Sequence, residues 1–300
     1  MITIKVPATS ANLGPGFDTL GLAVDLYNTI KIEKADKPGI EFLILGEGEG
    51  ILPAGRENIV YRAMEQVFAK VGSYPDGYLI TLDNAVPLSR GLGSSAAAIV
   101  GGLVLGNCLT GELLSREDIL DLATKIEGHP DNVAPAVFGG LVVSCLEEER
   151  VVHLRLDIPE NLQAVVAIPD FHLSTEKARK VLPKSIPFAD AVFNISRVGL
   201  LTAAFATGNL AVLEAAAQDK LHQNYRKPLI PGIDDVFKAA REAGAKAVML
   251  SGAGPSILAL ASGNEKEIAD GMQTAFEKAG IKSNVRVMNL CSNGYQVVKI

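Results

Sequence analysis

The chain has 300 residues, of which 48% are hydrophobic and 21% are charged, so it can form a sizeable core and is not disordered as a whole. Its 28 Lys and Arg against 34 Asp and Glu give a formal charge of −6, and no basic run occurs, which argues against nucleic-acid and anionic membrane partners. The longest apolar run, residues 96–105, is far shorter than a membrane span, which needs about 20 residues. The chain has no Trp, which disfavours a surface on which nucleic-acid bases stack.

The first half of the chain predicts a strand-rich domain. Strands are expected at residues 2–6, 22–32, 40–45 and 78–82. Helices are expected from a cap at Asn58 to a stop at Gly72, over residues 95–108, and from a cap at Ser115 to Glu127. Residues 129–132 are expected to form a turn, and strands at 141–146 and 151–156 close this half.

The turn at residues 159–161 is the predicted domain boundary, which divides the chain into residues 1–158 and 159–300. Beyond it, a strand at 163–168 precedes several helices between residues 174 and 241. A strand, glycine turn and strand at 246–261, a helix from Asn264, and strands near 285–288 and 295–300 follow. Strands and helices are interspersed without a strict βαβ rhythm, so the pattern predicts an α+β fold.

Two features bear on the compartment. Residues 1–6 alternate like a strand and lack the basic-then-apolar layout of a signal peptide. The three cysteines, Cys108, Cys145 and Cys291, lie in apolar strings and are odd in number, which is typical of buried thiols in a reducing environment. We therefore expect a cytoplasmic protein.

The strongest functional pattern is the segment at residues 87–98, Pro-Leu-Ser-Arg-Gly-Leu-Gly-Ser-Ser-Ala-Ala-Ala. Glycines let the backbone turn tightly and expose its N–H groups, and the helix that follows adds the positive end of its dipole. Two serine hydroxyls at the turn can donate to phosphate oxygens or hold a cation. The segment therefore predicts a phosphate-binding loop.

Competing catalytic motifs do not fit. The P-loop is excluded because the chain has no Gly-Lys pair. Gly91, Gly93 and Ala96 match a loose dinucleotide fingerprint, but a helix follows where a second strand ending in an acidic residue is required. The protein-kinase motifs His-Arg-Asp and Asp-Phe-Gly, the Gly-x-Ser-x-Gly elbow of hydrolases and zinc-type ligand clusters are also missing.

Two further glycine-rich segments accompany this loop. Residues 7–21 join two expected strands and are rich in small polar groups, and residues 249–256 lie between two others. Each alone is more typical of a tight turn than of a site. Three such turns in one chain indicate loops that converge on an anionic ligand.

At these residues the sequence resembles the GHMP kinases, named for galactokinase, homoserine kinase, mevalonate kinase and phosphomevalonate kinase. Residues 87–98 resemble the family's phosphate-binding loop, and residues 5–25 and 247–260 resemble its first and third motifs in the right order. Within the family, residues 8–18 and 129–135 are similar to the homoserine kinases. The resemblance covers essentially the whole chain.

The resemblance implies a ribosomal-protein-S5-like N-terminal domain and a ferredoxin-like C-terminal domain. It implies ATP and Mg²⁺ as cofactors and transfer of the γ-phosphoryl group to the hydroxyl of L-homoserine, a step of threonine biosynthesis. The nucleotide-binding residues that it implies are Pro87, Leu88, Ser89, Arg90, Gly91, Leu92, Gly93, Ser94, Ser95, Ala96 and Ala97.

The resemblance also assigns a magnesium site and a substrate site. Glu127, on an apolar face where an unpaired charge is costly, would hold the metal with help from Ser94. Asp18 and Asn12 would hold the substrate ammonium. Arginine suits a carboxylate because its planar fork makes two parallel hydrogen bonds. The resemblance implies that Arg179 and Arg226 bind the substrate carboxylate. It also places His129 and Asn132 on the substrate side of the site.

Phosphoryl transfer depends mainly on alignment and charge neutralisation, so a general base is optional. Thr175, one helical turn before Arg179, would touch the γ-phosphate. Asn132 would orient the hydroxyl, and Asp131 can accept its proton if the carboxylate points at it. The sequence leaves open whether that base operates. His153 and His222 are interpreted as structural or surface residues.

Two alternatives remain at this point. Another GHMP kinase, acting on mevalonate or a sugar, would not need both Asp18 and paired arginines, because only an amino acid presents both charges. A non-catalytic sensor with the same fold should have lost a phosphate or metal group, whereas Ser94, Ser95, Glu127 and Thr175 are all present. The oligomeric state, a homodimer included, is left open by the sequence.

Overall fold

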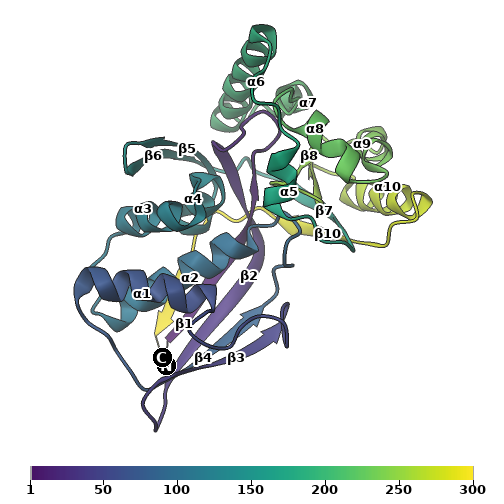
Figure 1. Ribbon diagram of the computed structural model, residues 1–300. Coiled ribbons are helices and arrows are strands. Elements are labelled where there is room, and N and C mark those ends of the chain that lie inside the picture. Colours follow the sequence, from purple (N-terminus) through teal and green to yellow (C-terminus); the bar gives the residue numbers. More distant parts are fainter. Residues whose placement is uncertain (1, 300) are drawn as a thin grey trace.

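The computed structural model describes residues 2–299, whose strands form two sheets (Figure 1). The strands of the larger sheet are β1 (Ile2–Ala11), β2 (Leu20–Lys34), β3 (Ile40–Gly46), β4 (Tyr78–Asn84), β5 (Leu141–Glu147), β6 (Arg150–Leu156) and β11 (Gln296–Lys299). Their order is β11-β1-β2-β4-β3. In addition, β5 pairs with the N-terminal end of β2, and β6 pairs with β5. All described pairs are antiparallel except β3 with β4.

Four helices lie on one face of this sheet: α1 (Ile59–Val71), α2 (Ser94–Leu109), α3 (Arg116–Glu127) and α4 (Pro130–Phe138) (Figure 1). The predicted caps are confirmed. Asn58 accepts from the amide of Val60, Ser115 and Asp118 form a capping box, and Gly72 ends α1 with a left-handed φ of 74°. These ends form from local sequence.

Helix α2 is the central helix of this layer, and its small residues explain how it fits there. A Cβ on Gly101 would lie 2.5 Å from Ile30 Cδ1, and one on Gly102 would lie 2.4 Å from the carbonyl oxygen of Val60. Larger side chains would push the helix away from β2 and α1. This close packing holds the N-terminus of α2 in place beside the loops described below.

The second sheet contains β7 (Gln163–Pro169), β8 (Ala247–Leu250), β9 (Ile257–Ala261) and β10 (Ser283–Asn289), in the order β10-β7-β9-β8. Helices α9 (Ile233–Glu242) and α10 (Glu265–Lys278) pack against it. The β-α-β-β-α-β succession with all pairs antiparallel is the ferredoxin-like arrangement. Further helices lie between β7 and α9: the long α6 (Phe188–Thr207) and the short elements α5 (Thr175–Lys180), η1 (Leu210–Val212), α7 (Leu213–Ala216), α8 (Gln223–Arg226) and η2 (Lys227–Leu229). The predicted two-domain α+β fold is confirmed.

The structure corrects three details. Strand β11 pairs with β1, so residues 296–299 belong to the first sheet although they lie beyond the predicted boundary; Ile300 lies outside the described residues. Residues 130–138 form α4, although a turn was expected at residues 129–132. Pro130 occupies the first helical position, where no N–H is needed, while Pro135 weakens the sequence pattern. Cys145 is exposed, because the end of β5 from this residue onward extends into solvent, whereas Cys291 is buried.

Helix α6 stands apart at one end of the molecule (Figure 1). Among the described residues it is the one helix whose length and hydropathy would allow it to cross a membrane. One side of it is nevertheless tied to the protein. Buried Asn194 donates to the carbonyl oxygen of Pro15 at 3.0 Å and to Asp219 Oδ1 at 2.8 Å, and Leu201 and Phe205 join the core between the two sheets.

Candidate active site

The three glycine-rich segments meet around one cavity of about 420 Å³. The Asn12 side chain donates to the carbonyl oxygen of Gly252 at 2.9 Å, which joins the first segment to the third. The Ser251 hydroxyl donates to the carbonyl oxygen of Gly91 at 2.6 Å, which joins the third segment to the second. The predicted convergence of the loops is therefore confirmed.

The loop before α2 has the backbone that an anion site requires. Gly91 and Gly93 have φ angles of 79° and 68°, in the left-handed region that favours glycine. A Cβ on Gly93 would lie 2.0 Å from Thr9 Oγ1, and one on Gly91 would lie 2.2 Å from the carbonyl oxygen of Ser251. Both positions therefore require glycine, and the loop and the start of α2, where the helix dipole is positive, line the cavity.

Glu127, the last residue of α3, lies at the wall of this cavity. Its Oε2 accepts a hydrogen bond of 2.9 Å from the Ser95 hydroxyl at the start of α2. Burial raises the pKa of Glu127 because it disfavours the charged form, although the bond from Ser95 opposes this. Ser94 lines the same cavity, while the described partner of Glu127 is Ser95.

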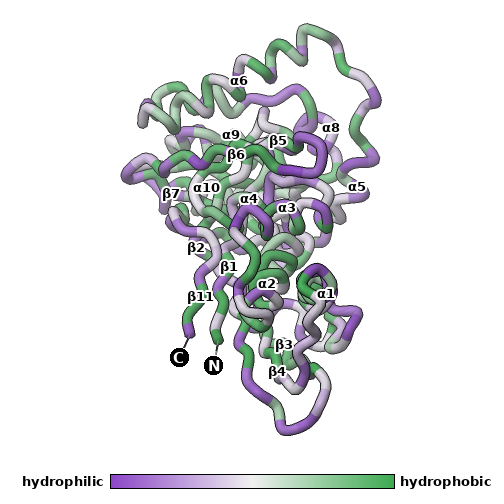
Figure 2. Tube along the Cα trace, turned by 90° about the vertical axis from the view of Figure 1, so that its left-hand side faces the viewer, coloured by the Kyte–Doolittle hydropathy of each residue, from purple (hydrophilic) through white to green (hydrophobic). Residues whose placement is uncertain are grey.

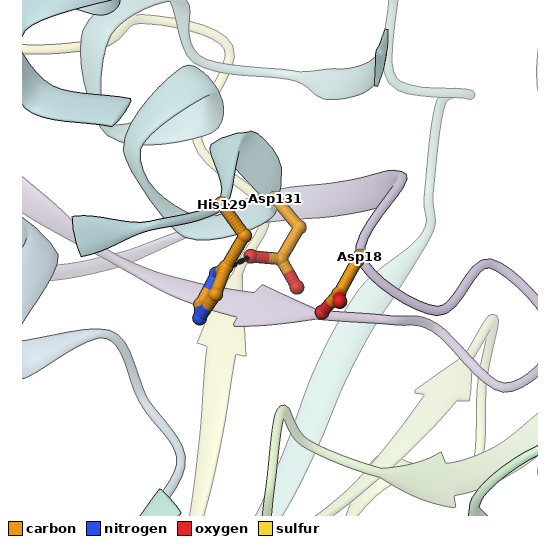
Figure 3. Close-up of side chains that lie close together, drawn as sticks. All are labelled: Asp18, His129 and Asp131. Atoms are coloured by element: carbon orange, nitrogen blue, oxygen red, sulfur yellow. Dashed lines mark hydrogen bonds and ion pairs between the residues drawn. The ribbon is translucent and has the colours of Figure 1, made fainter. Parts of the chain in front are cut away.

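Asp131 and its neighbours come from the start of α4 (Figure 3). His129 Nδ1 lies 2.6 Å from Asp131 Oδ1, which the dashed line marks. Burial lowers the pKa of His129, but the hydrogen bond to Asp131 and its charge outweigh this, so that the pKa is raised. Asn132 Nδ2 donates to the same Asp131 oxygen at 3.4 Å. The three side chains thus form one hydrogen-bonded group.

Thr9 holds Asn132 from the other side, a role that the sequence reasoning missed. Its buried hydroxyl donates to Asn132 Oδ1 at 2.9 Å, which fixes the orientation of the amide with Nδ2 toward Asp131. The signal for Thr9 lay only in its place within the polar segment 7–21. Because Thr9 is 123 residues from Asn132, only the fold reveals the contact.

Asp18 and Arg179 were expected to bind opposite ends of a substrate, and the structure pairs them with each other. Arg179 Nη1 donates to Asp18 Oδ2 at 3.1 Å, and Nη2 donates to Oδ1 at 2.6 Å. Asn12 Oδ1 accepts from the Asp18 amide at 3.0 Å, which holds Asp18 at a φ of 55°. Figure 3 shows the Asp18 carboxylate directed toward Asp131.

Arg226 is almost fully buried at the base of the cavity, where α8 ends. Its side chain donates to the carbonyl oxygens of Ala178 at 3.2 Å and Gly252 at 3.1 Å. Its Nη1 also lies 3.1 Å from Nδ1 of buried His222. Burial lowers the pKa of Arg226 to about 10, and the nearby charge of Arg179 adds to this effect. His222, interpreted from the sequence as structural or at the surface, is fully buried and supports Arg226 from behind the cavity wall.

The cavity collects nearly all of the predicted site residues, Thr175 included. Ala96 and Ala97 are exceptions: they are buried inside α2, where they allow close packing. The cavity also has an apolar part that the sequence reasoning missed. It lies around the start of α1, where Asn58 was interpreted only as a helix cap. The missed residues of this part are Leu52, Pro53, Ile59 and Leu82, which lie beside the predicted Leu88.

One grouping of possible metal ligands, Asp18, His129 and Asp131, has its ligand atoms within 4.8 Å of one another (Figure 3). Both Asp18 oxygens already face the Arg179 guanidinium, and Asp131 accepts from His129. The Arg179 guanidinium offsets the charge that would attract a metal. The group lies in the predicted substrate region and differs from the predicted metal pair of Ser94 and Glu127.

Comparison with known proteins agrees with this geometry. The family model described as GHMP kinases N terminal domain matches residues 58–140, and GHMP kinases C terminal matches residues 201–278. The homoserine kinase of Moorella thermoacetica is 51% identical over 298 residues, which cover 99% of this chain and 100% of that protein. The chain belongs to the GHMP kinase family.

Other GHMP kinases resemble it over nearly their whole length. The homoserine kinase of Petrotoga mobilis is 45% identical, with 99% of this chain and 97% of that protein covered. A crystal structure of homoserine kinase from Cytophaga hutchinsonii has a TM-score of 0.90 at 34% identity, covering 99% of this chain and 97% of that one. The mevalonate kinase of L. major, with a TM-score of 0.73 at 16% identity over 97% of this chain and 96% of that one, shares the fold alone.

Proposed function

We propose that this GHMP kinase transfers the γ-phosphoryl group of ATP to the hydroxyl of L-homoserine, with Mg²⁺, and so serves threonine biosynthesis. The observation that carries the proposal is the single cavity in which an anion-binding helix N-terminus meets a carboxylate and two arginines. The full-length similarity to homoserine kinases supports it. The expected cytoplasmic location, without nucleic-acid or membrane partners, remains a prediction.

The nucleotide binds along the loop before α2. The backbone amides after Gly91 and Gly93 hold the phosphates, because they are exposed and lie at the positive end of the helix dipole. The apolar side chains of Leu52, Ile59 and Leu82 receive the base at the other part of the cavity. Each group is therefore matched to one part of the nucleotide.

Glu127 fits a magnesium role because its carboxylate lies beside the Ser95 hydroxyl in a cavity that Ser94 also lines, and Mg²⁺ prefers oxygen ligands. Glu127 and Ser94 would hold the ion, with the Ser95 hydroxyl bonded to the same carboxylate. When bound, the ion neutralises phosphate charge. The protein itself aligns the two reactants.

The substrate is an amino acid because the cavity offers both charges that a zwitterion needs. Asp18 and Asn12 bind the ammonium, and Arg179 and Arg226 bind the carboxylate. In this proposal Asp18 and Arg179 separate when the substrate binds. Asp18 then pairs with the substrate ammonium and Arg179 with the substrate carboxylate. Charge balance in the cavity is then the same before and after binding.

Asn132 orients the substrate hydroxyl, with Thr175 near the γ-phosphate. Asp131 Oδ1 already accepts from His129 at 2.6 Å and Asn132 at 3.4 Å, which leaves it less available as a base. Catalysis by positioning and electrostatics is therefore favoured over base catalysis. Thr9, through Asn132, acts as a positioning residue.

A coupled ADP-release assay with L-homoserine, L-serine and mevalonate tests the proposed function. We expect turnover with L-homoserine well above that with the other two alcohols. Preference for mevalonate would assign a different GHMP kinase activity. Flat traces across the panel, with ATP binding retained in calorimetry, would instead indicate a sensor.

A further inference from the structure

We propose that a buried hydrogen-bond network positions Arg226 relative to the loop that carries Asp18, and so sets how tightly both ends of the substrate are held. The network consists of Asn194 on α6, Asp219, and His222 at the start of α8, and we call it the Asp219 network. The inference rests on the proposed function, in which Asp18 binds the ammonium and Arg226 the carboxylate. Figures 1 and 2 both place α6 and α8 in the part of the molecule far from the two termini.

Asp219 is the centre of the network. Its Oδ1 accepts from the Asn194 side chain and from the amide of Leu221, both at 2.8 Å. Its Oδ2 accepts from the amides of His222 at 3.0 Å and Gln223 at 2.7 Å. Each carboxylate oxygen therefore has two partners, and a buried polar network that is satisfied in this way is rigid. It fixes the backbone at the start of α8.

The network also holds the loop that carries Asp18. Asn194 donates to the carbonyl oxygen of Pro15 at 3.0 Å, and His222 Nε2 lies 2.8 Å from the carbonyl oxygen of Gly14. Two successive peptide groups just before Asp18 are thus bonded to the network. Asp18 itself has a φ of 55°, which few non-glycine residues adopt, so this loop depends on such bonds to keep its shape.

His222 connects this loop directly to Arg226. A carbonyl oxygen can only accept, so Nε2 of His222 carries the proton and donates to Gly14. Nδ1 of the neutral ring then has a free lone pair, to which Arg226 Nη1 donates at 3.1 Å. One imidazole therefore joins the Asp18 loop to the carboxylate-binding guanidinium through its two nitrogens.

The Phe17 ring provides a second connection. Its centroid lies 5.2 Å from the guanidinium carbon of Arg179 and 5.2 Å from that of Arg226. The same ring is 5.3 Å from the imidazole of His222. Because Phe17 precedes Asp18 in the chain, a movement of this loop would also displace the two arginines.

The bonding of Arg226 indicates that its placement serves a ligand. Among residues 2–299 its hydrogen-bond partners are the carbonyl oxygens of Ala178 and Gly252 and the neutral ring of His222, none of which is an acid. A buried cation without a bonded carboxylate is costly to the folded state. A core that served stability alone would place an apolar side chain here, whereas a carboxylate of the substrate supplies the missing anion.

A double-variant cycle in steady-state kinetics tests the proposal. His222→Gln keeps a donor for Gly14 but offers Arg226 no acceptor in place of Nδ1. We expect its KM for homoserine to rise at least about 10-fold, with kcat changed less than about threefold. In an Arg226→Met background the same substitution should change kcat/KM by less than about twofold, because its partner is already gone. Equal losses in both backgrounds would show a merely structural role and overturn the proposal.

Two controls accompany the cycle. His153→Gln is the matched substitution, because His153 stacks on Phe138 outside the cavity, and it should leave both constants unchanged. Circular dichroism and ATP calorimetry show that each variant is folded. A native chain without turnover of homoserine would contradict the proposed function, whereas an active native chain with equal losses in the cycle contradicts only the role of the network.

A crossed comparison separates the two bonds of the His222 ring. His222→Asn keeps an acceptor near Nδ1 but loses the donor to Gly14, the converse of His222→Gln. The probes are the amino alcohol and the hydroxy acid that remain when homoserine loses its carboxylate or its ammonium. As competitive inhibitors, the hydroxy acid should be weakened by His222→Gln alone and the amino alcohol by His222→Asn alone. Equal effects on both probes would overturn the proposal.

The native chain gives a readout that needs no His222 variant to fold. NMR of the isotope-labelled histidines should show the His222 ring neutral, with its proton on Nε2. Its signals are identified by their cross-peaks to the ring of Phe17. The Nδ1 signal should shift in Arg226→Met, because the donor is lost. A proton on Nδ1, or an Nδ1 signal that ignores Arg226→Met, would overturn the proposal.

Discussion

Arg179 and Asp18, which lie 161 residues apart in the chain, form a bidentate ion pair at the mouth of the cavity. Both side chains are about one third exposed, so solvent screens the pair and its own contribution to stability is small. Its value lies in keeping two charged side chains at the spacing that a zwitterionic ligand needs.

Replacing Arg179 by Met therefore affects substrate use more than stability. We expect kcat/KM for homoserine to fall by roughly 10- to 150-fold, the equivalent of about 1.5–3 kcal/mol for one charge-assisted hydrogen bond, while ATP affinity stays nearly unchanged. An amino alcohol without the carboxylate should be indifferent to the change. Arg179→Lys should restore part of the loss, because an ammonium cannot form the planar pair. Steady-state kinetics with a kcat/KM within twofold of the native value would show that the carboxylate lies elsewhere.

His222 makes the folded state less stable in acid. Its Nε2 lies 2.8 Å from the carbonyl oxygen of Gly14 and must donate there, so Nδ1 has no proton and accepts from Arg226. Burial lowers the pKa of His222, and the charge of Arg226 lowers it further, although Asp219 opposes this. The unfolded chain takes up a proton below about pH 6.5 that the folded chain does not, so stability falls as pH drops through this range.

A comparison of thermal unfolding for the native chain and His222→Gln measures this contribution. The Tm of the native chain should fall more steeply between neutral and mildly acidic pH than that of the variant, which has no group to titrate at this position. The three other histidines are common to both proteins and cancel in the difference. Parallel Tm curves would show that His222 is not held neutral.

Thr9→Val tests the positioning of Asn132. Valine has nearly the same shape but cannot donate, so Asn132 Oδ1 loses its partner and the amide can turn. We expect kcat to fall on the order of 10-fold, with ATP affinity retained and Thr9→Ser close to native. A rise in KM and a fall in ATP affinity with unchanged kcat would contradict a role through Asn132.

Gly93→Ala tests the phosphate loop. The new methyl group would lie 2.0 Å from Thr9 Oγ1, so the loop must move and its amides would no longer be placed to bind the phosphates. ATP affinity measured by calorimetry should fall strongly while the chain stays folded. Gly72→Ala is the control, because Gly72 has a similar φ of 74° but open space around its Cβ. Equal effects of the two substitutions on ATP binding would remove the assignment.

Glu127→Gln tests the metal role. The amide keeps the volume but binds cations weakly, so turnover should fall by at least about 100-fold while homoserine binding persists. The magnesium concentration for half-maximal rate should rise. Glu117→Gln, at the exposed start of the same helix, should leave both unchanged. Near-native turnover of Glu127→Gln at limiting magnesium would be incompatible with the role.

The sequence by itself determined the features that depend on neighbouring residues. The caps at Asn58 and Ser115, the glycine turn before α2 and the α+β class follow from local chemistry, which acts over a few residues in any context. The convergence of three glycine segments on one cavity was also correctly predicted, because such turns have few uses other than binding or tight reversal.

Only the tertiary structure decided which side chains meet. The pairing of Asp18 with Arg179, of Thr9 with Asn132, and of His222 with the Gly14 carbonyl joins residues more than 120 positions apart. The sequence reasoning also missed α4 and the return of β11 to the first sheet. Apolar periodicity shows that a helix or strand has an apolar face, but the same pattern occurs where that face packs in the core and where it lies at the surface. Which of the two it becomes is set by the space that the folded neighbours leave.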